Sequence, residues 1–180
     1  MRRALAVALA VTLAVTLAAV PARADLTQLS AQGFVAGFRD EIKAGPDEAW
    51  KAIVQPQRWW SDAHTWSGSA AHLSLDARAG GCWCERWGDG ASAQHAQVAM
   101  LLPGRLIRLR GGLGPLQGLP VEGVLEIATG SQDGKTFLRL SYRVGGPPDA
   151  GLEALAPAVE RVLGEQYRRL KALIETGRPD

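Results

Sequence analysis

The stretch that decides the fold of this chain is residues 151–175, which read GLEALAPAVERVLGEQYRRLKALIE. Aliphatic residues recur there at three- and four-residue steps, and charged side chains fill the positions between them. The apolar set is Leu152, Leu155, Val159, Val162, Leu163, Leu170, Leu173 and Ile174. Burying about seven such side chains at ~2 kcal/mol each gives a gross gain on the order of 14 kcal/mol. The pattern therefore predicts a long amphipathic helix whose apolar face needs a covering layer.

Working outward, the segment 34–43 alternates between apolar and charged residues. Phe34, Phe38 and Ile42 fall on one face of the predicted strand. Gly45-Pro46-Asp47-Glu48 then opens a short helix that runs to about residue 53, because proline suits an early helical position and acids suit the first turn. Residues 57–62 predict a second short helical turn.

The middle of the chain predicts a series of strands joined by short turns. Residues 66–75 hold one or two short strands, and residues 81–87 form a hairpin with 92–102 across the break GDGA. Residues 105–110 predict a short strand near an edge or a rim of the sheet, because arginines fall on both of its faces. Residues 121–127 and 138–144 predict a final hairpin, in which pairing Leu125 with Leu140 sets Glu126 opposite Arg139.

This order of elements predicts an α+β fold. Short connections between successive strands imply an antiparallel sheet, and the terminal helix must cover its concave face. We expect a curved sheet of six to seven strands wrapped around the long C-terminal helix, with two short helices after the first strand. Residues 25–180 suffice for one domain with a sizeable core.

The N-terminus has the features of a secretory signal peptide. A basic start, Met1-Arg2-Arg3, precedes an Ala/Leu/Val run and the small-x-small signal Ala22-Arg23-Ala24. Cleavage after residue 24 predicts an exported, periplasmic protein without stable membrane insertion. Loss of three arginines leaves 17 basic against 18 acidic side chains, so the chain has no excess of basic charge for nucleic acid.

Several motifs together resemble a known superfamily. They are the segment Ile42–Trp50 followed by Trp59-Trp60, the helix opening Gly151–Pro157, and Tyr167-Arg168-Arg169-Leu170-Lys171 near the end of the helix. The chain is similar to the START-related lipid-transfer and polyketide-cyclase (SRPBCC) superfamily, in the branch of the chaperone-ATPase activators. This resemblance implies a helix-grip fold, and it leaves the function open because carriers, cyclases and interaction modules share that scaffold.

All six tryptophans fall between residues 50 and 87. Trp50 is expected in the core, whereas one of the adjacent Trp59 and Trp60 is expected at a rim. In the register that pairs Trp87 with Ser92, an inner face carries Trp83, Glu85, Trp87 and Met100. These side chains either form a plain core or wall a cavity beneath the helix.

Glu85 is the most informative acid in this register. Facing inward, the carboxylate needs a partner or has a raised pKa, as carboxylates in dry pockets do. It is then a candidate for holding a polar ligand group or for general acid/base work. The alternative is an ion pair with Arg105 or Arg108.

Cys82 and Cys84 allow three interpretations. An exported protein favours a disulfide, although alternate residues of a strand lie at the upper limit of the spacing for one, which a bulge would relieve. Two free thiols are the second interpretation. The same register has Cys84 facing His95, which permits a metal site, but a fourth ligand is missing.

The loop 111–120 is too rich in glycine and proline for regular structure, yet it carries three leucines. It lacks the features of a phosphate-binding loop. Its apolar side chains must dock on the protein or contact a ligand.

The sequence therefore predicts a protein that holds a small hydrophobic, lipid- or polyketide-like molecule between sheet and helix. No metal or cofactor is expected. A cyclase- or hydratase-type enzyme using Glu85 or a nearby arginine is one rival, and a module that binds a protein partner is another. The candidate ligand-binding residues are Trp60, Trp66, Trp83, Glu85, Trp87, Met100, Leu113, Leu116, Tyr142, Val159 and Leu163.

Overall fold

The computed structural model describes residues 25–180, so the expected signal peptide lies outside the described residues. The strands are β1 (Asp25–Ser30), β2 (Gly33–Ile42), β3 (Leu73–Leu75), β4 (Cys82–Trp87), β5 (Ala91–Leu102), β6 (Leu106–Arg110), β7 (Glu122–Gln132) and β8 (Lys135–Gly145). The helices are α1 (Pro46–Ile53) and α2 (Leu152–Thr176). Short 3₁₀ turns are η1 (Pro56–Arg58), η2 (Asp62–His64), η3 (Ala70–His72), η4 (Gly114–Gly118) and η5 (Pro148–Ala150).

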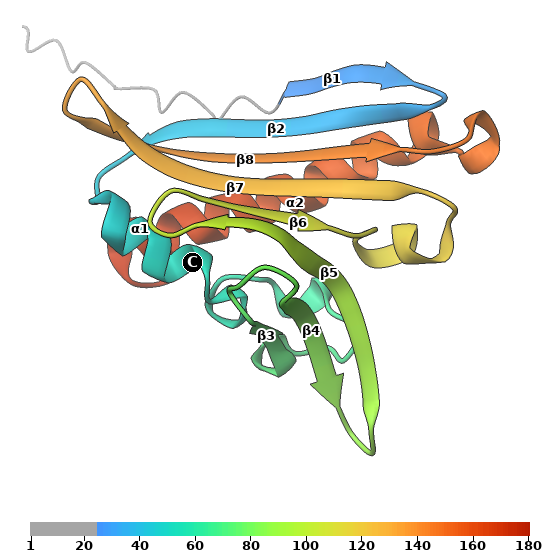
Figure 1. Cartoon of the computed structure of the whole chain (residues 1–180), viewed down its shortest axis with the longest axis horizontal. Helices are drawn as coiled ribbons and strands as arrows, with labels where there is room; N and C mark the ends of the chain where they lie inside the picture. The colour runs from blue at the N-terminus through green and yellow to red at the C-terminus, as the bar shows by residue number, and fades with distance from the viewer. Residues whose placement is uncertain (1–24) are drawn as a thin grey trace, which may run out of the picture.

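The strands form one antiparallel sheet in the order β1-β2-β8-β7-β6-β5-β4-β3, and α2 lies across one face of it (Figure 1). The predicted α+β class is confirmed. The sheet has eight strands rather than six or seven. The additional strand is β1, a polar segment that pairs with the edge of β2 and has no apolar alternation to signal it.

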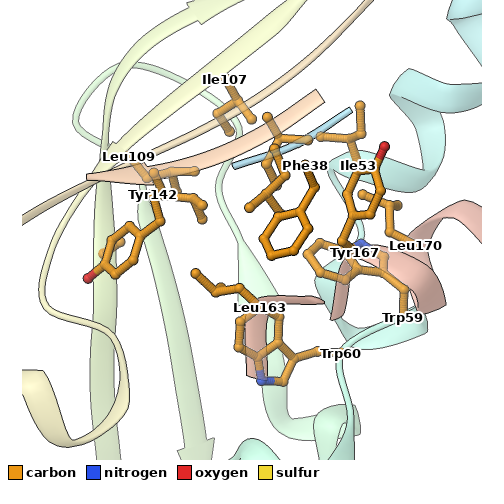
Figure 2. Close-up of a cluster of buried hydrophobic side chains, with 14 of the residues drawn as sticks. Phe38, Ile53, Trp59, Trp60, Ile107, Leu109, Tyr142, Leu163, Tyr167 and Leu170 are labelled. Carbon is orange, nitrogen blue, oxygen red and sulfur yellow. The ribbon is translucent and has the colours of Figure 1, made fainter. Parts of the chain in front are cut away.

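Helix α2 begins and ends within one residue of the predicted bounds, and its C-terminal half is packed solidly on the sheet. Tyr167 stacks on Phe38 of β2 with ring centroids 5.4 Å apart. A Cβ added at Gly164 would lie 3.2 Å from the ring of Phe38, so this glycine allows the close approach of helix and strand. Figure 2 shows these aromatic rings with Leu170 and Trp59 in the layer between sheet and helix. No helix within residues 25–180 is long and apolar enough to cross a membrane.

The final hairpin has the predicted faces but not the predicted register. Leu125 pairs with Tyr142 rather than with Leu140, a shift of two residues that leaves the apolar row inward. The cause is the turn, because Asp133 and Gly134 have φ of 52° and 76° and close a two-residue hairpin loop. Positive φ at both positions suits an Asp-Gly pair, and such a loop fixes the pairing of every residue behind it.

A β-bulge at His95 changes the pairing of β4 with β5. Trp83 pairs with Ala96, as the register of Trp87 with Ser92 implies, but Cys84 pairs with Gln94 and Trp87 with Ala91, so His95 is the extra residue. The predicted pairing of Cys84 with His95 is therefore wrong. A bulge resets the alternation of side chains, and His95 and its neighbour Ala96 are both buried.

A second bulge, at Ala99, changes which side chains of β5 point inward. Val98 pairs with Leu109 and is buried, whereas Met100 pairs with Arg108 on the other side of the extra residue. Met100 is exposed as a result, and its predicted place beneath the helix is wrong.

Strand β6 lies in the middle of the sheet, not near an edge as predicted. Its arginines are on the outer face, where Arg108 pairs with Glu126 and Arg110 with Glu122 across the ladder to β7. Interstrand ion pairs therefore explain these charges.

Candidate functional site

A cavity of about 340 Å³ lies beside the N-terminal half of α2. There the helix faces Trp83 and His95 of the β4–β5 hairpin, and the segments around η2 and η4 close the remaining sides. Leu155, Val159 and Val162 of α2 are only half-buried because they face this space instead of packed neighbours. The space beneath α2 is thus solid at one end and hollow at the other.

The cavity has a buried floor and a mouth open to solvent. Buried residues lining it include Leu73, Trp83 and Leu116. Exposed residues at the mouth include Trp66 and Ala158. The complete lining consists of Trp60, Ala63, His64, Thr65, Trp66, Leu73, Trp83, His95, Leu113, Gly114, Pro115, Leu116, Leu155, Ala158, Val159, Val162 and Leu163. No lysine, arginine or acid is among them, so the lining is mostly apolar.

Most of the predicted ligand-binding residues gather around this cavity. Those that line it are Trp60, Trp66, Trp83, Leu113, Leu116, Val159 and Leu163. They come from four separate parts of the chain, which the fold brings together. Glu85, Trp87, Met100 and Tyr142 do not line it. Trp87 is the last residue of β4, and this end of β4 lies at the tip of the hairpin (Figure 1). Alternation along the strand predicts which side chains point inward, but not how far along the strand the cavity extends.

Trp59 and Trp60 are both buried, which corrects the expectation that one would lie at a rim. The indole of Trp59 donates to the carbonyl of Ala52 at 3.0 Å, and that of Trp60 donates to the carbonyl of His64 at 2.8 Å. The irregular backbone after η1 turns both rings inward, edge to face, with centroids 5.5 Å apart. Trp60 lines the cavity and also packs edge to face on Trp83.

Tyr142 holds the wall of the cavity in place rather than lining it. Its hydroxyl accepts a hydrogen bond from the amide of Leu113 and donates one to the carbonyl of Gly111, each at 2.9 Å. Burial raises the pKa of Tyr142 to about 12, so the hydroxyl keeps its proton. A Cβ at Gly123 would collide with this hydroxyl, and glycine is needed there for the contact. The predicted docking of the leucine-bearing loop therefore has a specific anchor.

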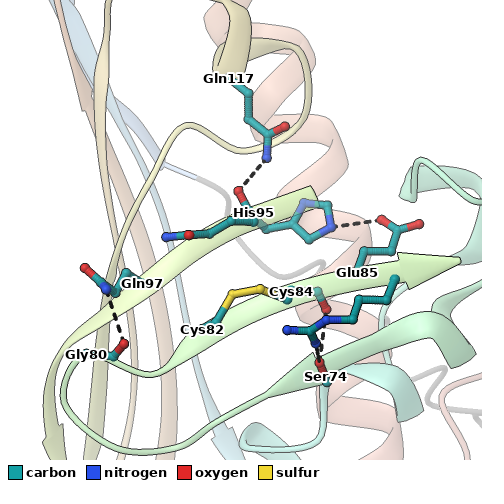
Figure 3. Close-up of a disulfide and its surroundings, with 10 residues drawn as sticks. Ser74, Gly80, Cys82, Cys84, Glu85, His95, Gln97 and Gln117 are labelled. Atoms are coloured by element: carbon teal, nitrogen blue, oxygen red, sulfur yellow. Dashed lines mark hydrogen bonds and ion pairs between the residues drawn. A yellow bond between two sulfur atoms is a disulfide. The ribbon is translucent and has the colours of Figure 1, made fainter. Parts of the chain in front are cut away.

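Glu85 is fully buried directly behind the cavity wall. Its carboxylate accepts hydrogen bonds from the amides of Ser67 at 2.5 Å and Trp66 at 3.1 Å, and from Nε2 of His95 at 2.9 Å. Figure 3 shows the imidazole of His95 directed at this carboxylate. The alternative partner Arg108 is bound to Glu126 instead.

The environment of Glu85 keeps it ionised. Burial alone would raise the pKa of Glu85, but the hydrogen bonds from Ser67, Trp66 and His95 outweigh burial and lower the pKa below its usual value. Of the two expectations for an inward-facing Glu85, a hydrogen-bonding partner or a raised pKa, the structure shows the first, although the partners are two backbone amides and His95 rather than an arginine. The carboxylate holds the segment 66–67 and His95 in place, and it does not itself contact the cavity space.

His64, in η2, also lines the cavity and lies at its mouth. Its Nε2 is 3.1 Å from Glu165 of α2. Burial would raise the pKa of Glu165, but hydrogen bonds from His64 and Ser61 lower it overall. The cavity thus has two histidines, one at the mouth and one at the floor, each held by a glutamate.

Cys82 and Cys84 form a disulfide close to Glu85 and His95 (Figure 3). Their Cα atoms are 5.4 Å apart, within the usual range for a disulfide and shorter than two regular strand steps of about 3.3 Å each. The shift in the β4–β5 ladder falls between Trp83 and Cys84, inside this bridge. Among residues 25–180, no group of three or more His, Cys, Asp and Glu side chains is placed to hold a metal.

Solved structures share this architecture. The chain is similar to CalU16 from Micromonospora echinospora, with a TM-score of 0.58, 18% identity, and coverage of 89% of this chain and 88% of that one. For EF2215 from Enterococcus faecalis, a conserved protein of unknown function, the TM-score is 0.57 at 14% identity, covering 86% and 78%. For the Aha1 dimer from Colwellia psychrerythraea the TM-score is 0.54 at 17% identity, covering 79% and 97%. No family model matches the chain, and no curated protein matches it significantly. These likenesses show the helix-grip fold.

Proposed function

We propose that this protein binds a small hydrophobic molecule in the cavity beside α2, as an exported and distant member of the START-related superfamily. The observation that carries this proposal is the cavity itself. Its volume of about 340 Å³ falls within the range of about 300–1,000 Å³ in which small-molecule sites are found, and its lining is apolar with few polar groups.

The energetics of the cavity favour a guest. Protein interiors are normally close-packed, and a cavity costs about 24 cal/mol per Å³ when neighbouring atoms do not fill it. A sealed, dry cavity of 340 Å³ would therefore cost on the order of 8 kcal/mol, comparable with the net stability of a domain. The open mouth reduces this figure by admitting water. A guest that displaces this water from Leu155, Val159 and Val162 gains the hydrophobic contribution instead.

Two rival functions have less support. An enzyme using Glu85 or an arginine of β6 would need these groups at the substrate, but Glu85 lies behind the wall and Arg108 and Arg110 lie on the outer face of the sheet. A protein-binding module would have a solid core and an exposed apolar patch. Large exposed apolar side chains within residues 25–180 are limited to Leu29, Trp66, Met100 and Leu102.

The proposal can be tested with N-phenyl-1-naphthylamine, whose fluorescence rises in apolar surroundings. The test uses two variants of α2, Ala158→Trp and Ala154→Trp. Both alanines are exposed and lie one turn apart, but only Ala158 lines the cavity. We expect the wild type and Ala154→Trp to bind the probe with micromolar affinity and Ala158→Trp to bind at least tenfold more weakly. Native mass spectrometry of the gently purified protein should also detect a co-purifying hydrophobic molecule.

The proposal fails if the wild type does not bind the probe. It also fails if both tryptophan variants bind the probe as well as the wild type, because binding would then lie elsewhere. Circular dichroism before each titration establishes that the variants are folded.

A further inference from the structure

Building on the proposed binding function, we infer that His95 is the polar anchor of the cavity and that it accepts a hydrogen bond from the hydroxyl group of a flat aromatic ligand. The chemical class is a phenol or an enol. Nothing in the apolar lining itself selects such a group. The inference rests on the buried pair of Glu85 and His95 at the cavity wall.

The pair fixes the position of the imidazole proton. An ionised carboxylate can only accept hydrogen bonds, and Glu85 is ionised because its pKa is lowered. Nε2 of His95, 2.9 Å away, must therefore carry a proton. In the neutral imidazole the other nitrogen, Nδ1, is then an acceptor with a free lone pair.

Within residues 25–180 the one hydrogen bond of the His95 ring is that of Nε2 to Glu85, which leaves Nδ1 without a partner there. The buried side-chain atoms of residues 25–180 that lack a hydrogen-bond partner include Nε1 of the neighbouring Trp83 but not Nδ1 of His95. We infer that Nδ1 is open to the space that His95 lines. The space that His95 lines is the cavity. On this inference His95 offers the cavity an acceptor nitrogen, and its chemical complement is a donor on the ligand.

The surroundings of His95 favour an uncharged hydroxyl as the donor group of the ligand. No lysine or arginine lines the cavity, and the ionised Glu85 behind His95 disfavours a second negative charge. A ligand carboxylate would therefore be poorly accommodated. Trp83 packs against His95 with ring centroids 5.8 Å apart and against Trp60 at 4.9 Å, edge to face. Aromatic walls beside the acceptor favour a flat aromatic body.

The test compares 1-naphthol with 1-methylnaphthalene, which has a methyl group in place of the hydroxyl. Affinities for both are measured by tryptophan fluorescence in the wild type, in His95→Phe and in His64→Phe. His64 is the matched control, because it also lines the cavity but has its glutamate partner at the mouth. We expect the preference for 1-naphthol over 1-methylnaphthalene to fall about tenfold in His95→Phe, the loss expected for one hydrogen bond. It should be unchanged in His64→Phe.

A second measurement needs no variant. Long-range ¹H–¹⁵N spectra of the histidine rings should show His95 as the Nε2–H tautomer, and 1-naphthol should shift its Nδ1 resonance while 1-methylnaphthalene should not.

Each outcome has a distinct meaning. If neither naphthalene binds the wild type, the proposed function falls together with the inference. If both bind and the preference survives in His95→Phe, or if Nδ1 carries the proton, the inference alone is overturned. Tighter binding of 1-naphthoate than of 1-naphthol would also overturn it, because His95 would then act as a cation.

Discussion

Replacing Glu85 with glutamine should strongly destabilise this protein, although the change removes only a charge and keeps the shape. Glu85 is fully buried and accepts three hydrogen bonds, from two backbone amides and from His95. A glutamine offers one acceptor oxygen. Its NH₂ group would face donors that now point at the second oxygen.

The magnitude follows from these contacts. Hydrogen bonds to a charged group contribute about 1.5–3 kcal/mol each, and a buried donor left without an acceptor costs about 1–3 kcal/mol. Since at least one donor loses its acceptor and the others lose the charge, we expect a loss of about 3–4 kcal/mol in the free energy of unfolding. The same substitution at Glu122, whose ion pair with Arg110 is exposed, should cost less than about 1 kcal/mol.

Urea unfolding of both variants, followed by tryptophan fluorescence, measures these losses. Six tryptophans report the transition, and Trp83 packs against His95, the partner of Glu85. If Glu85→Gln loses no more stability than Glu122→Gln, the carboxylate does not hold the segment 66–67 and His95 as described.

The same carboxylate makes stability depend on pH. The pKa of Glu85 in the folded protein is below the usual value of 4.5, so above pH 4.5 the ionised carboxylate contributes its full stabilisation to the folded state. This contribution is lost as the pH falls below 4.5 and through the folded pKa. Acid unfolding of the wild type should therefore be steeper than that of Glu85→Gln, and equal steepness would contradict the lowered pKa.

Three further predictions concern the packing around the cavity. Tyr142→Phe should lower the free energy of unfolding by about 1–3 kcal/mol, because the amide of Leu113 and the carbonyl of Gly111 lose their partner. Hydrogen exchange at the amide of Leu113 should accelerate, and unchanged exchange there would refute the role of Tyr142 as an anchor. Gly164→Val should lose about 1–3 kcal/mol in urea unfolding by pushing α2 away from Phe38, and a stable variant would show that this contact is loose. Reduction of the Cys82–Cys84 disulfide should cost only about 1–2 kcal/mol because the loop it closes is short, and alkylation without reductant would contradict the bond.

The parts of the fold that are encoded locally could be predicted from the sequence. The apolar spacing of residues 151–175 predicted α2 nearly to the residue, and Pro46 with two acids predicted the start of α1. The register of the final hairpin was also encoded, in Asp133-Gly134, but the prediction relied on cross-strand charge pairs. The turn sets the pairing of β7 with β8, because its backbone conformation fixes which residues face each other. Charge pairs across the strands do not, because they tolerate a shift of two residues.

The site was only partly predictable, because two bulges determine it. The extra residue at His95 brings an imidazole to the cavity wall, and the one at Ala99 removes Met100 from it. Neither position has a glycine or another local signal in the sequence. The role of Tyr142 depends on a contact with Gly111, 31 positions away, and Glu85 is held by Ser67, 18 positions away. Alternation along a strand cannot supply such long-range information.

The most direct test of the central claim is a crystal structure of the protein soaked with 1-bromonaphthalene. The anomalous signal of bromine locates the probe without assumptions about its binding mode. The account predicts one strong peak within the cavity, between Trp60, Leu116 and Val159. An empty or collapsed cavity at saturating probe, or bromine bound only elsewhere, would contradict it.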